Sequence, residues 1–135
     1  MRKPNKKMLT GGTVVKTRSG DLYMVFPVFT TPKESRAGWF NHEMVNGKVL
    51  IGLTSFGWTS LESYTNDLME EFRSLDSFDI VEVYQPTCQA AIGSLMEQLS
   101  FGNTSMDDML VMPGREKEGV GYIKVAERKE KNNEE

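Results

Sequence analysis

A predicted β-hairpin over Gly12–Val28 constrains the fold of this chain more than any other stretch of its sequence. Residues 13–18 are rich in β-branched side chains, and in residues 22–28 large apolar side chains recur at every second position, which is the period of a pleated strand. Between these strands, Ser19-Gly20-Asp21 predicts a three-residue turn, because glycine adopts a positive φ without steric cost. Pro27 has no N–H group for a ladder, so we expect the second strand to lie at a sheet edge or to leave the sheet there.

The dipeptide Asn46-Gly47 predicts a second hairpin between residues 39–45 and 48–53, because a type I′ turn needs a positive φ at both central residues. In the return strand, three apolar residues at alternate positions should place one side on a core: Val49, Ile51 and Leu53. The polar segment 30–38, which is interrupted by proline and glycine, should be an exposed loop between the two hairpins.

Two further strands are predicted nearer the C-terminus. Phe78–Tyr84 is rich in β-branched residues and is stopped by Pro86, and Val120–Ala126 follows as a last strand. Together with the two hairpins they predict a mainly β (α+β) fold. We expect a small β-barrel of about five strands with an appended amphipathic helix and a C-terminal strand.

An amphipathic helix is predicted over Thr87–Ser100, where the apolar period changes from two to about 3.6 residues. Gly102 is placed to end the helix. The apolar positions form one stripe: Cys88, Ala91, Ile92, Leu95, Met96 and Leu99. The stripe has two interpretations, because it either covers the barrel of its own chain or forms a two-fold dimer interface. The interface residues would then be Ile92, Leu95, Met96, Leu99 and Met109.

Two segments have weaker patterns. In residues 59–72, apolar side chains follow helical spacing, but many Ser, Thr, Asn and Asp side chains compete with helical backbone hydrogen bonds. We therefore expect only a short helix at Asn66–Arg73. In residues 104–112, Ser105 could cap a single helical turn, or Met109–Met112 could form a short buried run.

The 135 residues fit one domain of ordinary size. Residues 1–10 are expected to form a flexible lead-in, 11–86 the barrel, 87–126 the helix and an extension packed on the barrel, and 127–135 a charged tail. The first 20 residues hold six basic and no acidic residues although the net charge of the chain is −3, so a basic arm precedes an acidic body. Such an arm can contact nucleic acid.

Few side chains are available for catalysis or metal binding. The one cysteine, Cys88, rules out an internal disulfide, and with the one histidine, His42, it cannot complete a conventional zinc site. Cys88 begins the helical stripe, which favours a buried structural thiol. The adjacent carboxylates of Asp107 and Asp108 favour the start of a helix over a metal. We therefore expect no enzyme, no cofactor and no bound metal.

The apolar stretches of the sequence are short. None approaches the roughly 20 residues of a membrane helix, and the charged N-terminal residues are not followed by the apolar region of a secretion signal. A single cysteine also fits a reducing compartment. We expect a soluble, cytoplasmic protein without a membrane partner.

Three short motifs carry a family resemblance: Gly12-x-Val14-Val15-x-Thr17-Arg18-x-Gly20-x-x-Tyr23-x-Val25, Tyr64-x-x-Asp67-Leu68 and Phe78-Asp79-Ile80-Val81-x-Val83-Tyr84. On these motifs, residues 11–86 resemble a loose group of small SH3-like barrel proteins from phages, prophages and mobile elements of Gram-positive bacteria. The resemblance implies an SH3-like barrel and supplies no catalytic residues. Genes of this kind often encode accessory proteins that act against host defences, including inhibitors of CRISPR nucleases and proteins that sequester nucleotide signals.

The resemblance implies a non-enzymatic binding protein in the cytoplasm of the host cell. Its first expected partner is a bacterial defence complex, inhibited through protein–protein contact in the manner of an anti-CRISPR protein. Sequestration of a nucleotide signal is the alternative, and a nucleic-acid-binding accessory protein is a third. The aromatic side chains near the second hairpin could stack against a base or a partner side chain, or could fill the barrel core. The candidate binding residues are Arg18, Trp39, Phe40, His42, Trp58 and Tyr64.

Overall fold

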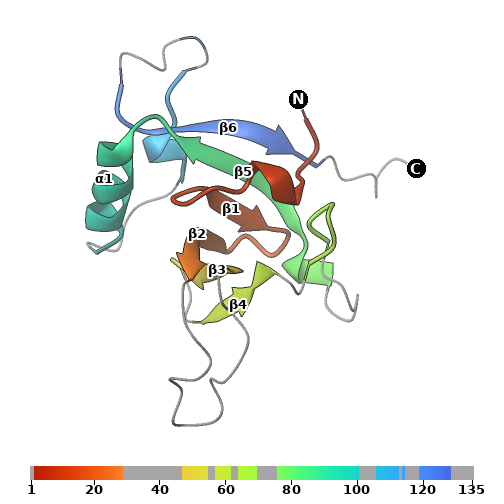
Figure 1. Cartoon of the computed structure of the whole chain (residues 1–135). Helices are drawn as coiled ribbons and strands as arrows, with labels where there is room; N and C mark the ends of the chain where they lie inside the picture. Colours follow the sequence, from red (N-terminus) through yellow and green to blue (C-terminus); the bar gives the residue numbers. More distant parts are fainter. Residues whose placement is uncertain are drawn as a thin grey trace, which may run out of the picture.

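The chain, described by a computed structural model, is built on one antiparallel sheet of six strands (Figure 1). The structure describes residues 2–28, 47–54, 57–61, 64–69, 76–100, 106–112, 114 and 119–128. The strands are β1 (Val14–Thr17), β2 (Leu22–Val28), β3 (Gly47–Gly52), β4 (Trp58–Ser60), β5 (Ile80–Pro86) and β6 (Tyr122–Glu127). Their order is β4-β3-β2-β1-β5-β6, so β4 and β6 form the edges.

The described strands form an open sheet and not the closed barrel that we expected. Closure would require β4 to pair with β6, and no such pair joins them among the described residues. The outer side of β6 is instead bridged by Arg2, which lies opposite Ala126, and by Leu110, which lies opposite Tyr122. Segments outside the sheet pack on each of its faces, so apolar side chains are buried without closure. The mainly β character of the chain is confirmed.

The first predicted hairpin is confirmed, with β1 and β2 in antiparallel register. Its loop has three residues but starts one residue earlier than expected, at Arg18. The N–H group of Gly20 donates to the carbonyl oxygen of Thr17 at 2.9 Å, and the N–H group of Thr17 donates to the carbonyl oxygen of Asp21 at 3.0 Å. Gly20 has a φ of 98°, a left-handed conformation that favours glycine at this point of the loop.

β3 pairs with β2 on one side and with β4 on the other. Its expected hairpin partner, residues 39–45, lies outside the described residues. The expected inward face of Val49, Ile51 and Leu53 is only partly correct. Leu50 on the opposite face is fully buried, whereas Ile51 is 38% exposed. Alternation misled the prediction here because the sheet has a core on each face.

The first face of the sheet packs against the N-terminal residues and against residues 61 and 64–69. This first cluster consists of Met8, Leu9, Val15, Val25, Leu50, Leu61, Tyr64, Leu68, Ile80, Val83 and Ala126. Residues 2–10, expected to be a flexible lead-in, include the 3₁₀ helix η1 (Lys6–Met8) and bury Leu9 completely. The burial of two adjacent apolar side chains holds this basic stretch against the sheet.

Residues 66–69 form a turn where we expected a short helix to begin. The N–H group of Leu68 donates to the carbonyl oxygen of Thr65, and that of Thr65 donates to the carbonyl oxygen of Met69, both at 2.9 Å. Leu68 has a φ of 62°, which costs a leucine about 1–2 kcal/mol. Its side chain is fully buried, and burial of a leucine stabilises by about 1.5–3 kcal/mol, which offsets this strain. Residues 70–73 of the predicted helix lie outside the described residues.

The second face is covered by α1 (Gln89–Ser100) and by the 3₁₀ helix η5 (Met106–Met109). This second cluster consists of Val14, Leu22, Met24, Tyr84, Ala91, Leu95, Met106, Met109 and Tyr122. The predicted amphipathic helix is confirmed, and η5 matches the single helical turn expected in its segment. The prediction of a buried thiol is wrong, because Cys88 is exposed. Its carbonyl oxygen accepts from the N–H group of Ala91 at 3.0 Å, so Cys88 precedes the first turn and lies off the buried stripe.

The two predicted C-terminal strands are confirmed as β5 and β6. β5 begins at Ile80, because the 3₁₀ helix η4 (Asp76–Phe78) precedes it. The start of the expected charged tail is tied to the sheet, since the side chain of Arg128 donates to the carbonyl oxygens of Ile80 and Asp67. Residues 129–135 lie outside the described residues. In the described part of the chain, no helix is long and apolar enough to span a membrane.

Candidate functional site

The second face of the sheet is covered unevenly. α1 and η5 pack on residues of β1, β2, β5 and β6, and Leu95 of α1 and Tyr122 of β6 are fully buried there. On β3 and β4, two large apolar side chains remain exposed, Ile51 by 38% and Trp58 by 55%. These two residues lie opposite each other in the β3–β4 register, and Ile51 also lies opposite Met24 of the second cluster, so both belong to this face. An exposed apolar pair at a sheet edge is a candidate contact surface.

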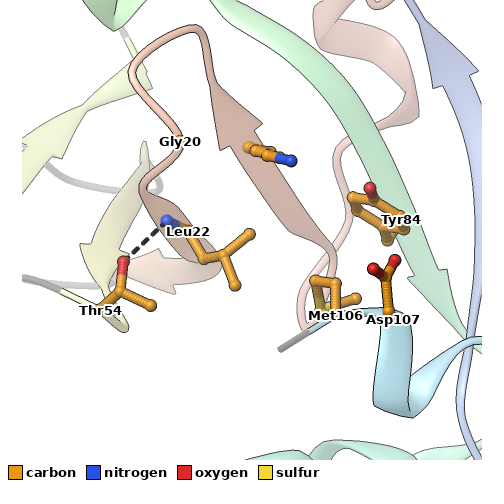
Figure 2. A pocket seen from close by; sticks show the side chains of 7 residues that line it. Gly20, Leu22, Thr54, Tyr84, Met106 and Asp107 are labelled. Carbon is orange, nitrogen blue, oxygen red and sulfur yellow. Dashed lines mark hydrogen bonds between the residues drawn. The ribbon is translucent and has the colours of Figure 1, made fainter. Parts of the chain in front are cut away.

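A cavity of about 210 Å³ opens on the same face, between the β1–β2 hairpin and η5 (Figure 2). Its lining residues are Lys16, Gly20, Leu22, Thr54, Tyr84, Met106 and Asp107. Figure 2 shows Tyr84 and Asp107 together on one side of the cavity and Leu22 with Thr54 on the other. The cavity therefore combines apolar, aromatic and charged walls.

The cavity and the exposed pair are neighbours on this face. The N–H group of Leu22 donates to Thr54 Oγ1 at 3.0 Å, and the carbonyl oxygen of Leu22 accepts from the N–H group of Leu53 at 2.8 Å. Leu53 is two residues beyond Ile51, a separation of about 7 Å along an extended chain. We call Ile51, Trp58 and the seven described residues that line the cavity the open surface.

A network of charges borders the cavity. Glu82 forms ion pairs with Lys16 at 4.0 Å and with Lys124 at 3.6 Å, and Lys124 also pairs with Glu127 at 3.7 Å. The hydroxyl group of Tyr84 donates to Glu82. Burial, and then the hydrogen bond to Glu82, raise the pKa of Tyr84 well above its usual value, because both favour the protonated phenol. Tyr84 therefore presents a neutral ring to the cavity at physiological pH.

Two of the predicted binding residues have structural partners instead of facing the open surface. Arg18 Nη1 lies 2.8 Å from Asp79 Oδ2, and the carboxylate of Asp79 is fully buried. Removing the arginine would leave this buried charge without its ion pair to Arg18, which is strongly destabilising. Tyr64 is 5% exposed and donates from its hydroxyl group to the carbonyl oxygen of Phe78 at 2.9 Å. Both side chains thus hold the chain just ahead of β5.

Trp58 is the predicted binding residue that lies on the open surface. Three others lie outside the described residues: Trp39, Phe40 and His42. Sequence patterns placed Ile51 on the core face, and they predicted no binding role for three residues that line the cavity: Lys16, Tyr84 and Asp107. These three come from segments far apart in the sequence and meet only through the order of the strands, so no local signal could have identified them.

The residues predicted for a dimer interface mostly pack within the chain. Leu95 is fully buried and Met109 is 4% exposed, while Ile92 and Leu99 are partly buried against the same second cluster. Met96 differs from them, because it is 42% exposed. This packing favours the interpretation in which the helix covers the sheet of its own chain.

Comparisons of the chain with protein-family models, with curated proteins and with solved structures gave no match. The resemblance to small proteins of phages and mobile elements therefore rests on the three sequence motifs alone. Within the described residues, no three His, Cys, Asp or Glu side chains gather closely enough to hold a metal ion. The open surface is thus the candidate functional site of the described part of the chain.

Proposed function

We propose that this chain is a non-enzymatic binding protein whose open surface contacts a partner protein. The observation that carries the proposal is the 55% exposure of Trp58 beside the exposed side chain of Ile51. Tryptophan is among the residues that dominate the binding energy of protein interfaces once a partner covers it. Trp58 also lies on the edge strand β4, and an exposed edge invites pairing with another chain, which proteins otherwise avoid with charges, proline or a covering segment. The adjoining cavity offers room for an anchoring side chain of the partner.

A bacterial defence complex is the partner that we propose first. Inhibition by contact is what the resemblance to proteins of phages and mobile elements implies, and it requires affinity without turnover. A surface with an aromatic residue next to a small cavity supports this kind of action, because anchoring residues typically occupy well-packed pockets. The chain would act in the cytoplasm of the host cell, where such complexes work.

Sequestration of a nucleotide signal is the weaker alternative. A nucleotide site needs basic groups that converge on phosphate. Among the described residues, the cavity presents one amine, that of Lys16, which already pairs with Glu82, and the carboxylate of Asp107, which repels phosphate. Nucleic-acid binding is the third proposal, supported by the exposed side chains of Lys3 and Lys7 through general attraction to phosphate.

Capture from a host lysate, run beside a thermal-shift screen of nucleotides, separates these classes. We expect the immobilised chain to retain a protein complex, and we expect no nucleotide to raise the Tm. A ligand at 100 times its Kd would add about 2.7 kcal/mol to the free energy of unfolding, which such a screen detects. A nucleotide that raises the Tm by several degrees, with no protein captured, would overturn the proposal in favour of sequestration.

A homodimer is a separate proposal, supported by a second group of exposed apolar side chains near the start of β6: Leu110, Met112 and Val120. The segments that carry them lie side by side, because the N–H group of Val111 donates to the carbonyl oxygen of Tyr122 at 2.9 Å. Two-fold dimers are the commonest closed assemblies. Light scattering at tens of micromolar tests this proposal, and a monomeric mass would remove it.

A further inference from the structure

The cavity of the open surface has an apolar wall of the kind that covers the stem of a long side chain. Leu22 and Met106 form this wall. They are only 6% and 5% exposed, because both pack against other residues of the second cluster. The ring of Tyr84 lies on another side, close to the carboxylate of Asp107 (Figure 2). At about 210 Å³ the cavity has room for one long side chain or for several waters.

The charges on the sheet side of the cavity balance one another. Lys16 and Lys124 both pair with Glu82, and Lys124 also pairs with Glu127. Two lysines therefore face two glutamates. The ammonium group of Lys16 contributes little net attraction for an incoming anion, because Glu82 lies 4.0 Å away.

The carboxylates on the other sides of the cavity are not balanced in this way. Asp107 lies on η5, and within the described residues no ion pair joins its carboxylate to a basic side chain. Asp21 follows Gly20 in the hairpin loop at the rim of the cavity, and its carboxylate accepts a hydrogen bond from Ser19. Among the described residues that line the cavity, Asp107 therefore carries a negative charge that no ion pair balances, and Asp21 adds a second one next to the lining residue Gly20.

We propose that the cavity receives a basic side chain, arginine or lysine, of the partner protein, an inference that rests on the proposed function. The stem packs on Leu22 and Met106, and the cationic group meets the carboxylate of Asp107 and the ring of Tyr84. Carboxylates form strong charge-assisted hydrogen bonds with guanidinium and ammonium groups, and a tyrosine ring attracts a cation within about 6 Å. An acidic side chain would be repelled by Asp107, and an apolar one would desolvate this carboxylate without replacing its hydrogen bonds.

Small probes test this inference without the partner. We expect N-acetyl-arginine N-methylamide, titrated into the ¹⁵N-labelled chain, to shift the backbone amide resonances of Leu22, Tyr84 and Met106 in a saturable way. A ligand of this size should bind with a Kd in the millimolar range. The corresponding glutamate and norleucine probes should not produce these shifts. The inference is overturned if the arginine probe gives no saturable shift there, or if the glutamate probe binds as tightly.

Two neighbouring variants separate a site from general attraction between charges. Asp107→Asn should weaken binding of the arginine probe by roughly threefold to tenfold. Asp108→Asn removes the same charge from the same turn at a residue that does not line the cavity, so it should leave binding unchanged. Lys16→Met removes a competing cation and should tighten binding. Equal weakening by the two aspartate variants would contradict the proposed site.

The failure of this inference can be told apart from the failure of the proposed function. Trp58 does not line the cavity, so Trp58→Ser tests the partner contact without changing the probe site. If Trp58→Ser abolishes partner capture while the probe does not bind to the wild-type chain, the proposed function stands and the cavity inference fails. If the probe binds as expected while Trp58→Ser leaves capture unchanged, the proposed function fails and the cavity remains a site for cations.

Discussion

The two halves of the second sheet face differ in what covers them, although in both halves successive side chains of a strand point to opposite faces of the sheet. α1 and η5 cover the half formed by β1, β2, β5 and β6, where Leu95 of α1 and Tyr122 of β6 are fully buried. On β3 and β4 the side chains of Ile51 and Trp58 remain 38% and 55% exposed. Apolar side chains in the covered half stabilise the fold. Those in the open half contribute little to folding and are free to bind. Alternation along a strand thus identifies which side chains share a face without identifying what lies on it.

Close backbone approach also distinguishes the covered half from the rim of the cavity. Gly12 lies beneath α1, where an added Cβ atom would come within 2.4 Å of Ile92 Cδ1. The hydroxyl group of Tyr122 donates to the carbonyl oxygen of Gly12 at 3.1 Å. At Gly20, on the rim of the cavity, an added Cβ atom would meet no described atom within 4 Å. The two halves should therefore respond differently to substitution.

The largest expected effect is that of a charge placed in the covered half. Leu95→Glu puts a carboxylate at a fully buried position of the second cluster, so the free energy of unfolding should fall by more than about 4 kcal/mol. Met96→Glu, one residue further along the same helix at a 42% exposed position, should cost less than about 1 kcal/mol. Urea denaturation measures both. A folded Leu95→Glu variant as stable as Met96→Glu would show that α1 does not cover this sheet.

A smaller effect is expected from a single methyl group at two glycines that share a positive φ. Gly12 and Gly20 have φ values of 88° and 98°, so alanine should cost about 1–2 kcal/mol at either position through backbone strain. Gly12→Ala should cost a further 1–3 kcal/mol or so, because Ile92 must move. Thermal denaturation of the two variants measures the difference. Equal losses of stability in the two variants would mean that the side chain of Ile92 can move aside at little cost and that α1 packs loosely on the sheet.

Alkaline pH should weaken the covered half through its buried phenols. Burial raises the pKa of Tyr122 to about 12, above the ordinary value of about 10. Between these values the unfolded chain loses the phenolic proton while the folded chain keeps it, so stability is full below about pH 10 and falls as the pH rises towards 12. Each such tyrosine should contribute up to about 1.4 kcal/mol per pH unit. Chemical denaturation at a series of pH values should show a shallower fall for Tyr122→Phe, and an unchanged slope would contradict this assignment.

The smallest effect on stability is expected in the open half. Trp58→Ser removes a side chain that is 55% exposed on a three-residue edge strand, so the free energy of unfolding should change by less than about 1 kcal/mol. Urea denaturation provides the measurement. A loss of several kcal/mol would mean that Trp58 belongs to the core, and the contrast between the two halves would then be lost.

Local signals were enough to predict several elements of the fold. β-branched runs, a glycine in the first turn and a 3.6-residue apolar period predicted the first hairpin, β5, α1 and β6. The open sheet could not be predicted in the same way, because the strand order depends on which distant segments pair. Met8 and Leu9 are two apolar residues in a basic stretch without periodicity, and only their burial by residues far along the chain explains why residues 2–10 are packed. The left-handed conformation of Leu68 has the same origin.

Less of the candidate site could be predicted. Trp58 was predicted as a binding residue because it belongs to a cluster of aromatic residues near the second hairpin, and its side chain is exposed in the structure. Arg18 and Tyr64 were also predicted as binding residues, but in sequence an arginine or a tyrosine looks the same whether it contacts a partner or contacts Asp79 and Phe78. The cavity could be predicted only with the strand order known, because its walls come from the first hairpin, from the residues after β3, from β5 and from η5.

Binding of the partner should depend on the open surface, and not on apolar exposure in general. The most direct test is capture from a host lysate with three immobilised chains: wild type, Trp58→Ser and Val120→Ser. Val120 is the matched control, because it is 54% exposed near the start of β6 and outside the open surface. We predict that the wild type and Val120→Ser retain the same protein complex, and that Trp58→Ser retains at least about tenfold less of it. Equal retention by Trp58→Ser and the wild type would contradict the account.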